Sequence, residues 1–431
     1  MNKQNKNRHA KDLLDLLSDA EELELTDVII DADELVINYI PPQAPQMPGY
    51  FKLSLEPLTG AGKIEFLVEA SPFGLRLLGP AAPPTPSVGK PKIIELIEVP
   101  FEYPKLRFTG KISEVTIGAT KSEGGTRSYT VKIGGSTTPP YFLFAETPPN
   151  PIAATLDVFD MPQVPKPVRE MYEDAVQIPS EWARVAVEKY GAQLISFHLI
   201  STDPGIKDTP ISEAAKNVEE VLQAVKVPLI IGGSGNPIKD VELFTKLSEV
   251  AAGERVVFNS VTLDMEIEKT VKPINQFGHD LIALAFIDIN QAKDLCRKSM
   301  EAGLSKDRLI LDPTTGALGY GIEYSFSIME RIRLAALMGE EVLQVPMCSA
   351  SSNAWAAREA SSKSPQLGPR SIRGPLWEAV TAIIAMLAGT DLFMMLHPKA
   401  MQTLKSFAEA LRKIRKPITE LPYEEWISTP F

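Results

Sequence analysis

Cysteine, long apolar runs and positive charge are all scarce in this 431-residue sequence. Its two cysteines, Cys296 and Cys348, supply too few thiolates for a disulfide framework or for an iron–sulfur cluster held by this chain alone. No segment approaches the roughly 18 apolar residues that a membrane span requires. Residues 1–12 also lack the apolar core of a secretory signal, so the sequence predicts a cytoplasmic protein without membrane contact.

Basic residues are outnumbered, since 44 Lys and Arg residues stand against 55 Asp and Glu residues, for a net charge of −11. This excess argues against a nucleic-acid surface, because such surfaces neutralise phosphates with Lys and Arg. The acidity is concentrated at the front of the chain, where residues 1–40 hold ten acidic and four basic residues. This uneven distribution predicts that the front forms a separate unit.

Residues 1–91 are predicted to form an acidic segment with one amphipathic helix and proline-rich linkers. Proline is dense in residues 41–48 and again in residues 79–86, and proline neither donates to a sheet nor fits inside a helix. The helix is predicted from leucines that share one stripe, and it either packs on its own domain or docks on a partner subunit. These leucines are Leu13, Leu14, Leu16, Leu17 and Leu23.

Short alternating runs broken by glycine predict a β-hairpin region over residues 92–150, as in KISEVTIGATKSEGGTRSYTVKIGG. A regular rhythm then begins, in which a β-rich apolar run is followed by a turn and a segment of helical period. Eight such units fill residues 151–416 and leave residues 417–431 as a tail. The runs begin at Ile152, Gln193, Val227, Arg255, Asp280, Arg308, Glu341 and Asp391.

The segments between these runs have the pattern of helices that cover a sheet. Residues 209–225 begin with Thr209 as the predicted cap and Pro210 in the first turn. Their apolar face consists of Ala214, Val218, Val221, Leu222 and Val225. Strands that are apolar on both faces and alternate with helices predict a parallel α/β sheet, and eight units suit a closed (β/α)8 TIM barrel. A doubly wound open sheet is the alternative, because strand closure is not visible in a sequence.

Functional residues of a barrel lie at the C-terminal ends of its strands. Here these positions carry amides, hydroxyls and scattered carboxylates, which suit a large ligand rich in heteroatoms better than bond breaking by a nucleophile. No G-x-S-x-G elbow, H-E-x-x-H motif or Walker lysine is present. The strand-end residues are His198, Thr202, Asp203, Gly232, Gly233, Ser234, Gly235, Asn236, Asn259, Ser260, Asp288, Asn290, Asp312, Thr314, Thr315, Cys348, Ser349 and Ser352.

Several of these residues also have a purely structural interpretation. Asn236 precedes Pro237 and is a natural helix cap, and the run GGSG either forms a tight turn or admits a ligand to the backbone. His198 is interpreted as a buried, satisfied histidine and Cys348 as a small core residue. The glycine-interrupted loop DPTTGALGYGIEYS favours contact with a ligand or partner, because such a loop is expensive to order alone.

Two resemblances refine this reading. The string FNSVTLD resembles the Asn-Ser-Ile/Val signature of pterin-dependent methyltransferase barrels, in which that Asn contacts a reduced pterin. A fuller resemblance, from about Gly110 onward, is to the small subunit of corrinoid iron–sulfur proteins, which in archaea is the delta subunit of the acetyl-CoA decarbonylase/synthase complex. It rests on GKISEVTIGAT, GGTRSYTVKIGG, PPNPIAATLDVFDMP, GGSGNPIKD, FNSVTLD, ILDPTTGALGYGIEYS and SSNAWAAREA.

The second resemblance implies a barrel without catalytic or metal-ligating residues that caps a corrinoid shared with a large (gamma) subunit. The iron–sulfur cluster would then belong to that partner, and acetyl-CoA synthase and carbon monoxide dehydrogenase subunits would complete the assembly. The corrinoid would carry a methyl group between a tetrahydropterin and the nickel–iron centre. The residues expected to contact the corrinoid are Thr202, Asp203, Gly233, Ser234, Asn259, Asp288, Asp312, Thr315, Gly316, Gly319, Tyr320 and Ser349.

The alternative is a methyltransferase that binds methyl-tetrahydropterin in its own barrel. One feature departs from the pterin pattern, because the third strand ends in GGSGN without an unambiguous Asp. The two hypotheses differ in what the isolated chain should bind.

Overall fold

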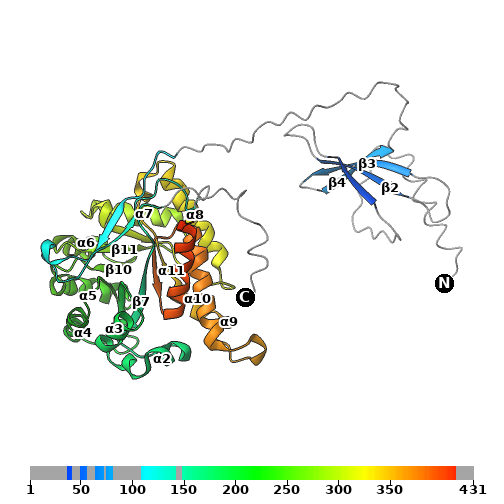
Figure 1. Ribbon diagram of the computed structural model, residues 1–431. Coiled ribbons are helices and arrows are strands. Elements are labelled where there is room, and N and C mark those ends of the chain that lie inside the picture. The colour runs from blue at the N-terminus through cyan, green and yellow to red at the C-terminus, as the bar shows by residue number, and fades with distance from the viewer. Residues whose placement is uncertain are drawn as a thin grey trace. The chain divides into compact units, whose positions relative to one another are not determined.

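A computed structural model describes residues 36–40, 49–55, 64–71, 74–80, 108–141 and 148–413. The chain divides into two compact units, Met1–Glu102 and Tyr103–Phe431 (Figure 1). The predicted leucine-rich helix, the linker at residues 41–48 and the tail at residues 417–431 lie outside the described residues.

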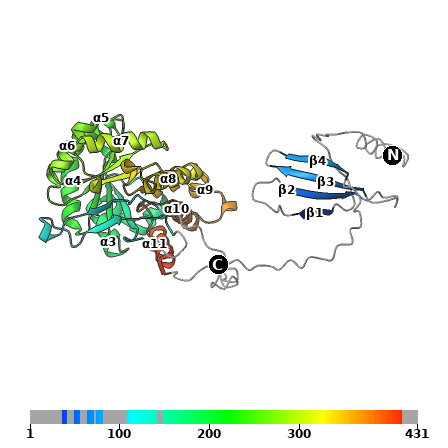
Figure 2. The same ribbon diagram turned by 90° about the horizontal axis from the view of Figure 1, so that it is seen from above.

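The first unit contains an antiparallel sheet of four strands in chain order (Figure 2). This sheet was not predicted, because the prolines of the neighbouring residues dominate the sequence pattern. A signal was present in residues 49–55, where Phe51, Leu53 and Leu55 alternate with Lys52 and Ser54. The strands are β1 (Val36–Ile40), β2 (Gly49–Leu55), β3 (Ile64–Ser71) and β4 (Gly74–Pro80).

The second unit is a barrel of eight parallel strands, in the order β12-β11-β10-β9-β8-β7-β14-β13. Its two ends meet, since Leu311 forms a parallel bridge with Met347 and its N–H donates to the Pro346 carbonyl at 2.9 Å. The predicted (β/α)8 barrel is therefore confirmed over the open sheet. The strands are β7 (Ala153–Phe159), β8 (Ile195–His198), β9 (Leu229–Gly232), β10 (Val257–Val261), β11 (Asp280–Leu284), β12 (Leu309–Asp312), β13 (Cys348–Ala350) and β14 (Leu392–Met395).

The seventh barrel strand is shorter and later than predicted. The run from Glu341 to Met347 was expected to form it, but Glu341–Leu343 is a 3-10 helix and β13 starts at Cys348. The apolar side chains of this run are buried against the helical layer, for example Leu343 and Val345, so burial without strand geometry produced the error.

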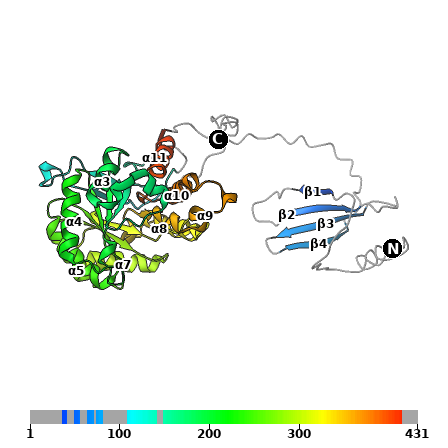
Figure 3. The same cartoon turned by 90° about the horizontal axis from the view of Figure 1, so that it is seen from below.

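Helices surround the barrel on its outside (Figures 1 and 3). They are α2 (Lys166–Tyr172), α3 (Pro179–Glu188), α4 (Ile211–Ala224), α5 (Pro237–Val250), α6 (Ile267–Gln276), α7 (Ile289–Glu301), α8 (Ile322–Leu337), α9 (Arg358–Ser361), α10 (Arg370–Leu387) and α11 (Pro398–Lys413). Among the described residues, no helix is long and apolar enough to cross a membrane.

The start of α4 corrects one prediction. All five residues of its predicted apolar face are buried. The N-cap residue, however, is Pro210 and not Thr209, and no side chain at this position accepts a hydrogen bond from the first turn. The Thr209 hydroxyl is buried without a hydrogen-bond partner in the described part of the chain. By contrast, Asn236 does cap α5, because its side-chain oxygen accepts from the N–H groups of Ile238 and Lys239.

An antiparallel hairpin, β5 (Glu114–Ile117) and β6 (Val131–Gly134), closes the N-terminal end of the barrel. Its position is fixed by Gly118, whose N–H donates to Arg255 just before β10, and by Ser128, whose N–H donates to Lys226 just before β9. The hairpin buries three apolar side chains in the barrel interior, where they contact the first inward-facing residues of the strands. These three are Val115, Ile117 and Ile133.

Arg127, in the loop between β5 and β6, anchors the hairpin to the barrel. Its side chain is buried, and its Nε lies 2.7 Å from a Glu254 carboxylate oxygen. Its two Nη atoms donate to the carbonyls of Leu222, Val225 and Val227, where α4 turns into β9. One side chain therefore satisfies several backbone acceptors at the end of a helix.

Candidate functional site

The barrel interior changes from apolar to polar toward the C-terminal strand ends. Side chains alternate along each strand, so residues two apart face the same side. On β10 the inward-facing Val257 is followed by Asn259, and on β12 Ile310 is followed by Asp312. Because the hairpin occupies the apolar end, the polar end is the one that opens to a ligand.

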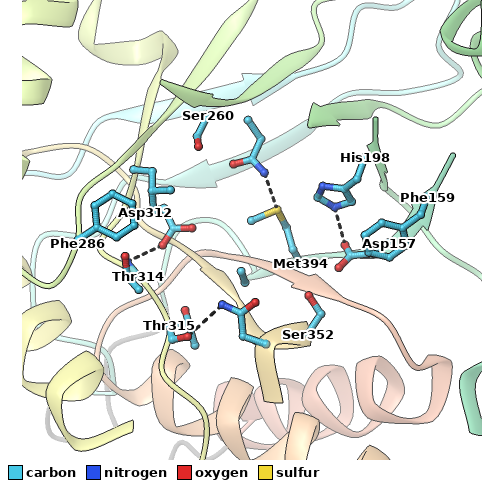
Figure 4. A pocket seen from close by; sticks show the side chains of 14 residues that line it. Asp157, Phe159, His198, Ser260, Phe286, Asp312, Thr314, Thr315, Ser352 and Met394 are labelled. Atoms are coloured by element: carbon cyan, nitrogen blue, oxygen red, sulfur yellow. Dashed lines mark hydrogen bonds and ion pairs between the residues drawn. The ribbon is translucent and has the colours of Figure 1, made fainter. Parts of the chain in front are cut away.

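A cavity of about 350 Å³ lies at this polar end (Figure 4). Among the described residues that line it, none is Lys or Arg. The lining residues come from seven of the eight strands, all but β9, and from loops that follow them. They are Asp157, Phe159, His198, Asn259, Ser260, Leu284, Phe286, Asp312, Thr314, Thr315, Ala350, Ser352, Asn353 and Met394.

Asp157 and His198 form a paired group on one wall of the cavity (Figure 4). The carboxylate of Asp157 is buried, and one of its oxygens lies 3.6 Å from His198 Nε2 and 3.3 Å from the Thr155 hydroxyl. The imidazole stacks on Phe159 with ring centroids 5.0 Å apart. It also lies against Gly232, where a Cβ would approach within 2.4 Å of Nδ1. Gly232 therefore makes room for the imidazole in the barrel.

Asp312 lies across the cavity from Asp157, and Figure 4 shows its carboxylate pointing inward. One of its oxygens accepts from the Thr314 N–H at 2.8 Å. Burial raises the pKa of Asp312 to about 6, and the hydrogen bonds from Thr314 and the Cys348 thiol act in the opposite direction. The carboxyl group is therefore mostly ionised at neutral pH but is easily protonated just below it.

We expect Asp312→Asn to change the pH dependence of stability. The folded-state pKa lies above the ordinary value of about 4, so the folded chain holds this proton more tightly than the unfolded chain. The resulting stability is complete below pH 4 and is lost as pH rises through 6. Relative to wild type, the variant should gain about 2–3 kcal/mol in unfolding free energy between pH 4 and 7. Urea unfolding across this range measures it, and parallel curves for the two proteins would contradict it.

Two amides complete the polar lining, and each directs one of its two N–H groups at a partner within the protein. Asn259 Nδ2 lies 3.7 Å from the Met394 sulfur, and Asn353 Nδ2 donates to the Thr315 carbonyl at 3.1 Å. The peptide bond that follows Asn259 is cis, and the register between β10 and β11 shifts at this point.

Exposed apolar side chains lie in the loops after β11 and β12, which also supply lining residues, and at the start of α8. Phe286 lines the cavity and is 61% exposed, while Tyr320 and Tyr324 are 68% and 63% exposed. The two loops are joined by the Ile287 N–H, which donates to Pro313. Ile287 and Thr314 both have positive φ, a conformation that such residues seldom adopt and that often marks functional loops. We call Phe286, Ile287, Tyr320 and Tyr324 the rim.

A 3-10 helix at Ser351–Ala356 carries Ser352 and Asn353 to the cavity, and Trp355 fixes it to α10. The Trp355 indole N–H donates to Glu378 at 2.9 Å. Its ring lies against Gly374, where a Cβ would come within 2.3 Å of the indole. Glu378 also accepts from the N–H groups of Leu396 and His397, so one buried carboxyl group joins three elements.

The model of one protein family, described as the CO dehydrogenase/acetyl-CoA synthase delta subunit, matches residues 114–396. The chain belongs to this family. An Archaeoglobus fulgidus relative named acetyl-CoA decarbonylase/synthase complex subunit delta is 46% identical over 347 residues, which cover 78% of this chain and 77% of the relative. A Methanocaldococcus jannaschii relative of the same name is 40% identical over 435 residues and covers 97% of this chain and 96% of its own.

Among solved structures, a Coxiella burnetii dihydropteroate synthase in complex with pteroic acid is similar at a TM-score of 0.45 and 12% identity. It covers 70% of this chain and 100% of its own. The barrel of this delta-family chain is established by its own strand order.

Three of the twelve residues predicted to contact a corrinoid line the cavity of this delta-family chain: Asn259, Asp312 and Thr315. Tyr320 lies on the rim. The other eight lie outside the lining, and all of them except Gly319 have hydrogen-bond partners within the protein. They are Thr202, Asp203, Gly233, Ser234, Asp288, Gly316, Gly319 and Ser349.

The GGSG turn shows how these partners arise. Asp240 accepts from the N–H groups of Ser234 and Gly235 at 2.9 and 2.8 Å, and Gly233 donates its N–H to the Asn259 carbonyl. A Cβ on Gly233 would come within 2.4 Å of the Asp240 carboxylate. The tight-turn interpretation therefore explains these glycines without a ligand.

Three more of these residues, Thr202, Asp203 and Asp288, also have local hydrogen-bond partners. The Thr202 hydroxyl donates to the Leu199 carbonyl at 2.7 Å, and Asp203 accepts from the Gly205 N–H at 2.6 Å. Asp288 caps α7, since its side chain accepts from two N–H groups in the first turn of that helix.

The remaining three residues support the loop after β12. Gly316 donates its N–H to the Ser325 hydroxyl, and Gly319 has a positive φ of 70°. Ser349 is buried in a chain of hydroxyls between Thr315 and Ser351. These residues shape the loop that presents Thr315 and Tyr320.

Sequence reasoning missed the end of the first strand. Asp157 and Phe159 were not among the predicted residues, although a carboxylate inside the apolar run IAATLDVF was a usable signal. His198 has a hydrogen-bond partner as predicted, the Ser196 hydroxyl at 2.9 Å, but its side chain is only partly buried because it lines the cavity. Cys348 is a buried residue of the barrel interior, as predicted. No group of three or more His, Cys, Asp or Glu residues in the described ranges could hold a metal ion.

Proposed function

We propose that the chain caps a corrinoid that is held jointly with the large (gamma) subunit of a cytoplasmic acetyl-CoA decarbonylase/synthase complex. In this complex the corrinoid supplies the cobalt that carries a methyl group between a tetrahydropterin and the nickel–iron acetyl-CoA centre. The acetyl-CoA synthase and carbon monoxide dehydrogenase subunits are the further partners. Membership of the delta-subunit family supports this proposal.

The observation that carries the proposal is the pairing of an acceptor-lined cavity with an exposed apolar rim. A corrin is a broad disc with amide arms, so it needs an apolar surface for its ring and hydrogen-bonding groups for its arms. The rim offers Phe286 and Tyr320, and the cavity beside it offers Asn259, Asp312 and Thr315. Exposed apolar groups of this kind commonly mark binding surfaces.

The cysteines support placing the iron–sulfur cluster in the partner. Cys296 lies on α7 and Cys348 lies in the barrel interior, and both side chains are buried. Burial raises the pKa of the Cys296 thiol to about 12, which disfavours the thiolate that a cluster requires. The role proposed for this chain is therefore to cover and orient the cofactor.

The cavity also favours a second candidate function, in which the barrel binds methyl-tetrahydropterin directly. A volume of about 350 Å³ suits a bicyclic ring with a short substituent, while a corrin disc must remain outside. Asp157, Asn259 and Asp312 would then accept hydrogen bonds from the ring N–H groups. Both functions use Asn259 but assign it different tasks.

Asn259→Ala separates the two functions when corrinoid retention and methyl transfer are measured on one preparation of the complex. If Asn259 contacts corrin arms, its loss removes one hydrogen bond from a large interface, so retention should weaken by about 1–2 kcal/mol while the subunits still associate. Methyl transfer should then fall only in proportion to corrinoid occupancy.

If Asn259 instead holds a pterin and steadies the leaving group, methyl transfer should fall by roughly a hundredfold while corrinoid retention is normal. This result would overturn the capping proposal. Asn236→Ala is the matched control, because it removes an amide of the same kind that caps α5 away from the cavity.

A further inference from the structure

We propose that the cavity binds the N–H₂ groups of the corrin's amide arms, so that the chain selects amidated corrinoids over those whose arms are carboxylic acids. This inference rests on the proposed function and adds the chemical group that enters the cavity. It is carried by the two carboxylates in the lining and by the lack of Lys and Arg among the described lining residues.

The donors of several lining side chains are already used within the protein. Asn353 donates its N–H to the Thr315 carbonyl, and Asn259 points its N–H at the Met394 sulfur. The Thr314 hydroxyl donates to the Ala285 carbonyl at 2.9 Å. The amide oxygens and the Thr314 hydroxyl lone pairs remain as acceptors for a ligand, and each amide keeps its second N–H group.

Two carboxylates in the lining favour ligand groups that donate hydrogen bonds. Asp157 and Asp312 enter from opposite sides of the cavity, and an ionised carboxylate can only accept hydrogen bonds (Figure 4). A primary amide offers two N–H donors without charge. A carboxylate arm would instead bring a third negative charge into a space with no Lys or Arg among its described lining residues.

The volume of the cavity suits the amide arms of a corrin and not its ring. A cavity of about 350 Å³ holds one or two short amide arms, whereas the disc is too broad to enter. Phe286 lines the cavity and is exposed, so it can contact the ring from which the arms project, and the exposed Tyr320 follows Thr314 and Thr315 of the lining in the same loop. The rim and the cavity thus bind two parts of one ligand.

The test compares cobinamide, which has amide arms, with cobyrinic acid, which has carboxylic acid arms. Each is titrated into the full-length chain by isothermal titration calorimetry at neutral pH in about 0.5 M NaCl, which screens the net negative charge of the protein. Cobinamide should bind at least about tenfold more tightly, because each misplaced carboxylate forfeits charge-assisted hydrogen bonds. Equal affinities would overturn the inference.

Variants locate the selectivity. Asp157→Asn and Asp312→Asn should each reduce the affinity ratio severalfold, because each replaces an acceptor-only group with one that also donates. Asp294→Asn is the matched control, since it removes the same charge from an exposed pair on α7 and should leave the ratio unchanged. If Asp294→Asn changes the affinity ratio as much as the two cavity variants do, the selectivity comes from overall charge, which contradicts the inference.

The outcomes also separate this inference from the proposal on which it rests. If neither compound binds to the chain or to its complex with the large subunit, the capping function fails. If both bind equally, capping stands and the amide selectivity fails. The wild-type ratio decides the question even if a variant does not fold.

Discussion

Trp355→Ala should lower the free energy of unfolding by about 3–5 kcal/mol, the usual cost of deleting a buried Trp side chain. The indole is 8% exposed, and it fills the space that Gly374 leaves open on α10. Its loss also deprives Glu378 of one N–H donor. The helix Ser351–Ala356 should then detach from α10 and displace Asn353 from the cavity. Urea unfolding measures the first effect, and cobinamide affinity measures the second.

Trp355→Phe is the control for this prediction, because it keeps an aromatic ring against Gly374 and removes the N–H group. Burial raises the pKa of Glu378 to about 8, and the hydrogen bonds from Leu396, Trp355 and His397 act against this shift. Losing the Trp355 donor alone should cost about 1–3 kcal/mol. If Trp355→Ala unfolds within about 1 kcal/mol of wild type, the helix is not anchored through Trp355.

Arg127→Ala should destabilise the barrel by about 3–5 kcal/mol, the typical cost of breaking a buried ion pair by removing one partner. The substitution leaves Glu254 with only its hydrogen bonds from Thr126 and removes the Arg127 donors from the carbonyls of Leu222, Val225 and Val227. The hairpin should then loosen from the N-terminal end of the barrel. Hydrogen exchange of the Gly118 and Ser128 amides reports this directly, and urea unfolding gives the free energy.

Lys111→Ala provides the comparison on the same unit. Lys111 pairs with Glu114 at 3.8 Å on the surface, so its loss should change stability by less than about 1 kcal/mol. A similar effect for Lys111→Ala and Arg127→Ala would show that the Arg127 contacts do not hold the hairpin.

The barrel could be predicted because its strands and helices have distinct periodicities. Runs such as LIIG and LILD are buried at every position, and between them α4 presents one apolar face to the barrel. The boundary of β13 was misplaced, because burial of Leu343 and Val345 has the same sequence signature in a 3-10 turn as in a strand. Closure itself could not be predicted, since it depends on the pairing of Leu311 with Met347, which are distant in sequence.

The candidate site was harder to predict, because the position of a residue near a strand end does not fix the direction of its side chain. Asn259 and Asp312 face inward, whereas Ser349 is a neighbour of the inward-facing Cys348 and points elsewhere. Asp288 and Ser234 lie beyond the ends of their strands, where Asp288 caps α7 and Ser234 donates its N–H to Asp240 in the first turn of α5. Asp157 was not predicted because it lies within the apolar run that predicts its strand, and positions in such a run are expected to belong to the core.

The hairpin of β5 and β6 has a kinetic consequence. Because it fills one end of the barrel, whatever occupies the cavity has to depart through the mouth by which it arrived. The residence time of a bound group then depends on the surface laid over Phe286 and Tyr320 more than on the depth of the cavity. A partner that docks there closes the mouth of the cavity, so its dissociation limits the rate at which the bound group exchanges.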